Sequence, residues 1–211
     1  MSNKNLKITL LQALNEDISK YGFVLRKSQN EFFQKCDVGE NRFEITFYTK
    51  HLLSVTCATS IRCSIIQDIY CNILQSQGYV RRYHTFYSMM QDYPNFRGSF
   101  EFIIDKEENI SEPQRNILKY FQTVSLDFYR RYDSLEKIFQ LYSGYTTKEE
   151  TLVRQNASWY DKTLILAKVL GKKEYPELVK EYREKVKHWD QGIYLPTFEK
   201  VVSALESYPS M

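Results

Sequence analysis

Apolar residues at the start of the chain recur first every three or four positions and then every second position. Residues 6–21 follow the first spacing, which places their apolar side chains along one stripe of a helix that Gly22 is suited to end. Closely spaced β-prone runs follow at residues 23–27, 31–36, 42–48 and 53–63. Their short separations favour antiparallel hairpins, because a parallel crossover needs about a dozen residues or more.

The two longest β-prone runs alternate clearly enough to predict which side chains face a core. Phe43, Ile45 and Phe47 share one face of the first run, and the positions between them are polar or charged. In the second run, one face carries Leu53, Val55, Cys57, Thr59, Ile61 and Cys63, and the reverse face carries Ser54, Thr56, Ala58, Ser60 and Arg62. One side of the predicted sheet should therefore meet a core and the other side water.

The end of the sheet region gives mixed signals. A helical spacing over residues 65–77 predicts a helix with Gly78 at its end. Alternation in 99–104 predicts a fifth strand, whereas the stretch 79–97 has no clear period. Within that stretch, residues 79–87 fit either a sixth strand or a loop.

Beyond residue 110 the apolar spacing becomes helical. A seam of apolar and aromatic residues, at alternating three- and four-residue steps, runs from Leu118 to Tyr142. Two interpretations compete. The first is one long helix over 112–143, and the second is a pair of helices with a break at 133–136, where Asp133 would cap the second helix. The continuity of the seam favours the single helix.

Three further helices complete the predicted C-terminal region. Residues 147–150 form a capping box that opens a helix to about Leu170, with Gly171 as its stop. Residues 175–188 and 195–205 each carry a proline in their first turn and repeat the helical spacing. The sequence thus predicts an α+β fold. It consists of an N-terminal helix plus a mainly antiparallel sheet of four to six strands, followed by a C-terminal bundle of about four helices.

Length and composition limit the class of protein. The chain has 211 residues, of which 43% are hydrophobic and 26% charged, as is typical of a folded globular protein. The sheet region, 1–106, and the helical region, 107–211, form either two abutting lobes or one compact domain. No apolar run approaches the roughly 18 residues of a membrane helix, so we expect a soluble protein with no membrane association.

Cysteine usage and the first residues of the chain indicate a compartment. The four cysteines form no Cys-x-x-Cys pair, and we expect them to be reduced thiols. The N-terminus contains no apolar segment of signal-peptide length. Both observations predict a cytoplasmic protein, and the abundance of Lys, Asn, Ile and Tyr is typical of an AT-rich bacterial gene.

We find no recognised catalytic pattern in the sequence. It contains no Gly-x-Ser-x-Gly elbow, no phosphate-binding Gly-x-x-x-x-Gly-Lys loop and no dinucleotide-binding Gly-x-Gly-x-x-Gly loop. His188 and Asp190 lie two residues apart, and side chains at that spacing do not face each other on a helix. The three histidines and four cysteines are not grouped at metal-ligand spacings. We therefore predict no catalytic residue, no metal and no cofactor. An enzyme whose site assembles only in three dimensions is an alternative.

The densest chemical feature is a basic and aromatic segment at residues 79–87. Its candidate binding residues are Arg81, Arg82, Tyr83 and His84, and Arg97 is a further candidate downstream. Cations interleaved with aromatic rings suit a protein contact, or a single-stranded nucleic acid whose bases stack on the rings. The structural alternative, which we take as the default, is an edge strand or loop in which arginine stems cover tyrosine rings. An isoelectric point of about 8.5 weighs against nucleic acid, because dedicated nucleic-acid domains usually exceed about 9.

The aromatic content of the chain supports a binding role. Its 17 Tyr, 13 Phe and 2 Trp make up 15% of the residues, and aromatic side chains are enriched at protein interfaces. The aromatic seam suits pairing with a second copy as a homodimer, but packing within the same chain is the favoured interpretation. The leading hypothesis is a non-catalytic binding protein, such as an accessory or toxin-neutralising partner. Its partner would be a protein of unknown identity, with nucleic acid as the alternative.

Overall fold

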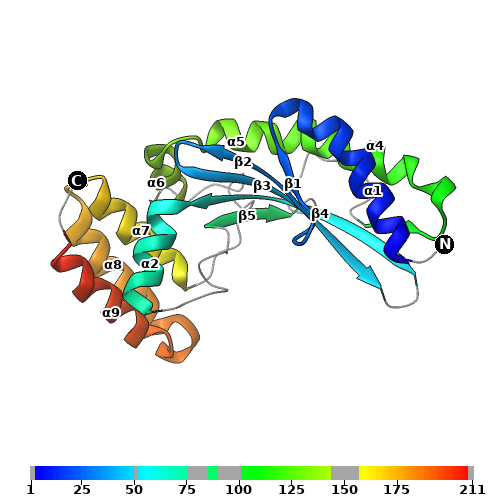
Figure 1. Cartoon of the computed structure of the whole chain (residues 1–211). Helices are drawn as coiled ribbons and strands as arrows, with labels where there is room; N and C mark the ends of the chain where they lie inside the picture. Colours follow the sequence, from blue (N-terminus) through cyan, green and yellow to red (C-terminus); the bar gives the residue numbers. More distant parts are fainter. Residues whose placement is uncertain (1–2, 50–51, 76–84, 90–100, 144–156, 209–211) are drawn as a thin grey trace.

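The computed structural model describes residues 3–49, 52–75, 85–89, 101–143 and 157–208. The described residues form a curved antiparallel sheet with helices over one face and a further group of helices at one end (Figure 1). Buried apolar side chains from Leu6 to Leu205 form one connected core. The predicted α+β fold is confirmed, whereas the division into residues 1–106 and 107–211 stays a prediction.

The strands form a meander in chain order. They are β1 (Val24–Arg26), β2 (Glu31–Cys36), β3 (Gly39–Thr49), β4 (Leu53–Cys63), β5 (Phe86–Met89) and β6 (Phe102–Ile104). The sheet order is β1-β2-β3-β4-β5, and β6 pairs with the first residues of β4 while β5 pairs with its second half. Every pairing is antiparallel, as the close spacing of the β-prone runs predicted.

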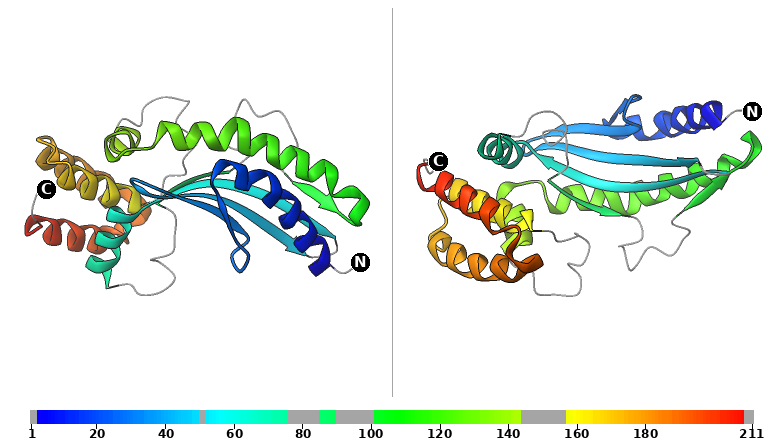
Figure 2. Two further views of the ribbon diagram at one scale, coloured as in Figure 1. Left: turned by 45° about the horizontal axis from the view of Figure 1, so that its top comes forward. Right: turned by 90° about the horizontal axis from the view of Figure 1, so that it is seen from below.

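The helices divide into a layer over the sheet and a group at its end, seen from two further sides in Figure 2. The covering layer contains α1 (Asn3–Ile18), α4 (Ser111–Tyr120), the π-helical turn η4 (Phe121–Ser125) and α5 (Leu126–Arg131). The end group contains α2 (Ser64–Leu74), α6 (Leu135–Ser143), α7 (Ser158–Val169), α8 (Tyr175–His188) and α9 (Leu195–Glu206). The 3-10 turns are η1 (Ser19–Tyr21), η3 (Glu107–Asn109) and η6 (Trp189–Gly192).

The covered face of the sheet is the apolar face that the alternation predicted. Phe43 and Val55 are fully buried there, and the Phe43 ring meets Phe121 of η4 at 5.1 Å between centroids. Two hydroxyls inside this core satisfy each other, because Thr59 Oγ1 lies 2.6 Å from Ser125 Oγ. This pairing explains how a serine fits into the aromatic seam. The opposite face of the sheet, called the outer face below, carries the polar positions of the same strands.

The single long helix predicted over 112–143 is wrong. Tyr132 leaves the helical conformation, with φ −120° and ψ 41°, and α6 begins three residues later. Ser134 Oγ accepts a hydrogen bond of 3.4 Å from a backbone N–H in the first turn of α6. The break carries the seam from the sheet onto the end group, where Tyr142 stacks on Trp159 at 3.9 Å. The seam remains largely buried on both sides of the break, so the periodicity of the seam could not locate the break.

The helix ends predicted at Gly22 and Gly171 are confirmed, whereas the end predicted for the second helix at residue 77 is wrong. Gly22 and Gly171 have φ of +81° and +61° and follow the ends of their helices, as predicted. Helix α2 ends at Leu74, and Gln75 takes the left-handed conformation three residues before Gly78. The predicted capping box at 147–150 lies outside the described residues.

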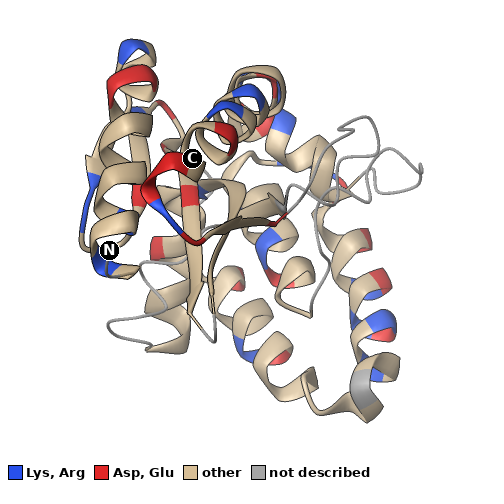
Figure 3. Ribbon diagram, turned by 90° about the vertical axis from the view of Figure 1, so that its right-hand side faces the viewer, with Lys and Arg blue, Asp and Glu red and all other residues tan. Residues whose placement is uncertain are grey.

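Charged residues of both signs are distributed over the helices (Figure 3). This mixture agrees with the near balance of 29 basic and 26 acidic residues in the chain. Among the described residues, no helix combines the length and the apolar character needed to cross a bilayer.

Candidate functional site

The predicted binding residues Arg81, Arg82, Tyr83, His84 and Arg97 lie outside the described residues. The structure describes only the end of the basic and aromatic segment, where Thr85 precedes strand β5.

Thr85 is fixed to the sheet and to the end group by buried hydrogen bonds. Its backbone N–H donates to Ile61 O at 2.7 Å, and its Oγ1 accepts from Cys63 N–H at 2.7 Å. Its carbonyl oxygen accepts from the Tyr142 hydroxyl at 3.0 Å and from Lys162 Nζ at 2.9 Å. The chain therefore enters β5 from a rigid anchor point.

The two residues after Thr85 point to opposite faces of the sheet. Phe86 is buried and packs edge to face against Tyr132 and Tyr142, so it belongs to the core. Tyr87 pairs with Ser60 across β4 and β5 and lies on the outer face. Within the segment 79–87, the described aromatics thus divide between a core residue and a half-buried residue on the outer face.

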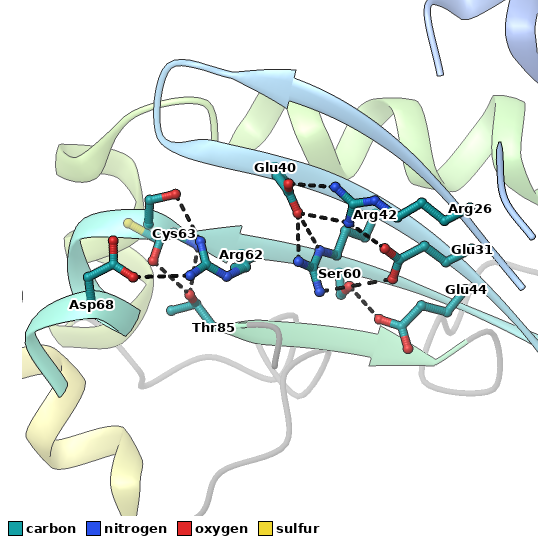
Figure 4. Close-up of polar contacts among 11 residues, drawn as sticks. Arg26, Glu31, Glu40, Arg42, Glu44, Ser60, Arg62, Cys63, Asp68 and Thr85 are labelled. Carbon is teal, nitrogen blue, oxygen red and sulfur yellow. Dashed lines mark hydrogen bonds and ion pairs between the residues drawn. The ribbon is translucent and has the colours of Figure 1, made fainter. Parts of the chain in front are cut away.

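A network of ion pairs occupies the middle of the outer face (Figure 4). Arg26 lies 2.7 Å from both Glu31 and Glu40, and Arg42 lies 2.6 Å from Glu40. Arg26 also stacks on the Phe33 ring, with its guanidinium carbon 3.5 Å from the ring centroid. Four strand positions thus contribute charges that are distant in sequence but adjacent in the sheet.

Electrostatic pairing dominates the titration of Glu40 in this network. Partial burial alone would raise the pKa of Glu40, but hydrogen bonds and charge from Arg26 and Arg42 outweigh it and lower the pKa to about 2. Arg42 and Glu31 are both less than a tenth exposed, so the centre of the network is closed to solvent. These charges compensate one another, which suits a structural role more than capture of a charged ligand.

The outer face changes character along its strands. Towards α2, Arg62 binds Ser64 Oγ at 3.0 Å and Asp68 at 3.1 Å (Figure 4). At the other end, the strand register places Tyr48, Ser54 and Ile103 in one row across β3, β4 and β6. The exposed fractions of Tyr48 and Ile103 are 50% and 59%.

Leu52, directly before β4, is 51% exposed and borders this row. We call Tyr48, Leu52 and Ile103 the apolar row. It is the apolar end of a face that is charged in the middle.

A second polar cluster is buried among α2, α7 and the start of α9. Tyr194 donates a hydrogen bond of 2.5 Å to Asp161 Oδ2, and the Tyr70 and Tyr194 hydroxyls are 2.8 Å apart. The side chain of Asp161 is fully buried, and its Oδ1 atom has no hydrogen-bond partner among the described residues. Burial raises the pKa of Asp161 to about 7, although the tyrosine hydroxyls and Lys162 oppose the shift.

Lys162 follows Asp161 on α7 and is also perturbed. Burial lowers the pKa of Lys162 to about 8, and the charge of Asp161 opposes this shift. A carboxyl and an amine that both titrate near neutrality are a pattern found at catalytic sites. Open pockets of about 630, 500 and 420 Å³ lie on the described surface, and neither Asp161 nor Lys162 lines any of these three.

Cys57 and Cys63 do not have the properties of nucleophiles. Burial raises the pKa of Cys57 and Cys63, the latter to about 11, so both thiols stay protonated at neutral pH. No group of three His, Cys, Asp or Glu side chains within the described ranges is placed to hold a metal ion.

Sequence reasoning missed Asp161 and Lys162. A signal was present, because this adjacent charged pair lies inside a helix that is apolar around most of its circumference. Such a helix is buried, and a charge within it must be paired, hydrogen-bonded or shifted in pKa.

Comparison of the chain with protein-family models, with curated proteins and with solved structures found no match. The function is therefore inferred from the site alone.

Proposed function

We propose that this protein is a non-catalytic binding protein whose partner is another protein. The observation that carries the proposal is the apolar row of Tyr48, Leu52 and Ile103 at one end of the outer face. Each of these side chains exposes half of its surface or more, and all three lie at one end of a rigid sheet. Grouped exposed apolar residues on a folded protein mark interaction sites.

The surroundings of the apolar row support a protein partner. Protein interfaces combine an apolar centre with a polar rim, and exposed Thr46, Thr49 and Glu101 lie beside this row in sequence or in the sheet. The row needs little reorganisation to bind, because strand pairing fixes the backbone of Tyr48 and Ile103. An interaction through such a row buries tyrosine and branched aliphatic surface rather than forming new ion pairs.

The basic and aromatic segment enters the proposal as a second contact region. Arg81, Arg82, Tyr83 and His84 lie one to four residues before the anchored Thr85 in the sequence. We propose that these residues, with Arg97, recognise acidic groups of the same partner. Single-stranded nucleic acid is the alternative ligand for this segment.

The buried position of the perturbed titratable groups supports binding over catalysis. Asp161 and Lys162 are the described groups that most resemble an acid–base pair; Asp161 is fully buried, and Lys162 is half-buried with its amine bound to the Thr85 carbonyl. A substrate would have to displace packed tyrosines to reach Asp161. The alternative of an enzyme requires a conformation that opens this cluster.

Affinity capture with matched surface variants tests the proposal. The tagged protein, expressed in its native host, should retain one protein partner at near-equal stoichiometry. The double variant Tyr48→Ser with Ile103→Ser should lose that partner by about tenfold or more, because interface aromatics contribute about 2 kcal/mol each. The control double variant Ile8→Ser with Ile193→Ser changes other exposed apolar residues, 45% and 73% exposed, and should retain it.

Three outcomes contradict the proposal. These are no stoichiometric partner, equal loss in both double variants, and a partner whose retention is unaffected by the apolar row. Capture of nucleic acid that is released by added salt and abolished by Arg81→Ala with Arg82→Ala would establish the alternative ligand instead.

A further inference from the structure

A groove separate from the outer face lies where the covered face of the sheet emerges from beneath α5. Its volume is about 420 Å³, within the range of small-molecule sites. Strands β2 and β3 contribute Gln34 and Asn41, the turn η1 contributes Tyr21, and the π-helical turn contributes Gln122. Single π-helical turns inside α-helices are frequent at functional sites.

The floor of the groove is polar, although it lies on the apolar face. Gln34 and Asn41 pair across β2 and β3, one step beyond the buried pair Phe32 and Phe43. Asn41 Nδ2 donates to Gln34 Oε1 at 3.4 Å, and Gln34 Nε2 donates to the Tyr21 carbonyl at 3.0 Å. These bonds orient the two carboxamides side by side, and each amide nitrogen retains a second N–H.

One wall of the groove combines an aromatic ring and a third carboxamide. Gln122 Nε2 donates to the Tyr21 hydroxyl at 2.9 Å, and the Tyr21 ring rests edge to face on Phe121. Gln122 Oε1 has no hydrogen-bond partner among the described residues. Tyr21 is 38% exposed, so its ring offers a surface beside a free acceptor and the amide donors of the floor.

The mouth of the groove carries one exposed group of each charge. Side chains of Arg130 and Asp133 line it and are 77% and 55% exposed; Asp133 pairs with Lys137 at 2.8 Å, and Arg130 lies 3.7 Å from Asp127. The groove thus presents carboxamides and an aromatic ring inside, and a carboxylate and a guanidinium outside.

We propose that this groove binds a nucleoside 5′-phosphate. Carboxamides match the paired donors and acceptors on the edge of a nucleobase, and a tyrosine ring stacks on or beside its face. A carboxylate accepts hydrogen bonds from ribose hydroxyls, and Asp133 would take this role while it shares its oxygens with Lys137. Arg130 is placed to pair with the phosphate. This ligand and site go beyond the proposed binding of a protein partner, because they use the opposite side of the sheet.

Calorimetry and ligand-detected NMR on the full chain test this site. The probes are adenosine, guanosine, cytidine and uridine, their 5′-monophosphates, and ribose 5-phosphate. At least one monophosphate should bind, and Gln122→Ala should weaken it about fivefold to tenfold, as expected for one lost hydrogen bond. Arg130→Ala should weaken that monophosphate and leave its nucleoside unchanged. The controls Gln140→Ala and Arg131→Ala change exposed residues that do not line the groove and should have no effect.

The results show whether the groove binds a nucleoside phosphate, and whether a free nucleotide or a nucleic acid supplies it. The proposal is overturned if no nucleoside or monophosphate binds, if ribose 5-phosphate binds as well as they do, or if Gln122→Ala binds as tightly as the parent. A ten-nucleotide single strand that binds more tightly than the monomer, and is weakened by Gln122→Ala, identifies nucleic acid as the source of the same chemistry. Thermal melting of each variant checks that loss of binding does not reflect unfolding.

Discussion

Glu40 and Asp161 are carboxyl groups in polar clusters whose pKa values move in opposite directions. Glu40 lies between two guanidinium groups, which stabilise its charged form despite partial burial. Asp161 is fully buried and is hydrogen-bonded by a neutral tyrosine, while the adjacent Lys162 donates to Thr85. The difference shows that burial raises the pKa of a carboxyl unless opposite charges beside it outweigh the burial.

The two groups give the stability of the fold opposite dependences on pH. A carboxyl in the unfolded chain titrates near pH 4. Between about pH 4 and 7 the unfolded chain has lost the Asp161 proton that the folded chain retains, so the unfolding free energy falls as pH rises. Between about pH 4 and 2 the folded chain keeps Glu40 ionised, so the unfolding free energy falls as pH drops.

The largest effect is expected when the network of ion pairs on the outer face loses a cation. Arg42→Ala leaves the buried carboxyl of Glu31 and the carboxyl of Glu40 with Arg26 alone, and should cost about 3 kcal/mol or more. Urea unfolding at pH 7 measures the cost. The control Arg115→Ala removes an exposed arginine of α4 and should change stability by less than about 0.5 kcal/mol. Equal costs for both variants would mean that the network contributes nothing.

Removing the hydroxyl that faces Asp161 is expected to have the next largest effect. Tyr194→Phe leaves Asp161 Oδ2 and the Tyr70 hydroxyl without their partner and should cost about 2 kcal/mol. The cost should be greater at pH 8 than at pH 5, because the ionised carboxylate needs the bond more. Tyr208→Phe, which removes a hydroxyl at the C-terminal end of α9, is the matched control. A cost that is the same at both pH values contradicts the assignment.

The buried carboxyl itself should make the protein more stable when it is neutralised. Asp161→Asn keeps an acceptor for Tyr194 and removes the charge, so it should raise stability at pH 8 by about 2 kcal/mol. The fall in stability between pH 4 and 7 should also flatten. Chemical denaturation at pH 4.5, 6 and 8 measures both effects, and Asp37→Asn, at an exposed aspartate, should preserve the slope. A variant less stable at pH 8 than the parent argues that Asp161 is held ionised.

The smallest effect is expected from neutralising Glu40. Glu40→Gln keeps the shape of the side chain but weakens its bonds to Arg26 and Arg42. Because Glu40 is partly exposed, solvent screening limits the cost at pH 7 to about 1 kcal/mol. The fall in the unfolding free energy between about pH 4 and 2, the acid limb of the stability profile, should become smaller. An unchanged acid limb would assign acid unfolding to other carboxyls.

Local patterns predicted the elements whose causes are local. The alternation around Phe43 and Val55 predicted both the strands and the buried face, because side-chain direction in a strand follows sequence position. The run at 53–63 matches the observed strand β4 residue for residue. Glycine at position 22 predicted the end of the first helical segment for the same reason, since the left-handed conformation depends on the residue itself.

Features that depend on three-dimensional register could not be predicted in this way. Arg26 and Glu40 are fourteen residues apart in the sequence. Their side chains meet because they lie on β1 and β3, the two strands that flank β2. A break at 133–136 was weighed but not favoured, because the seam is largely buried against the sheet before Tyr132 and against α7 after it. Asp161 carries no sequence motif, and its pKa arises from burial against α2 and α9.

The position of β4 has a consequence for the order of events during synthesis. Strands β1 to β4 lie within the first 63 residues and pair locally, so this meander can form soon after it leaves the ribosome. Helix α1 precedes the strands, but the rest of the layer over their apolar face, α4, η4 and α5, ends only at Arg131. At elongation rates of about 5 to 20 residues per second, that face stays exposed for roughly 3 to 14 s before residue 131 is synthesised. Nascent chains arrested between these two points should therefore depend on chaperones, and release past residue 131 should end that dependence.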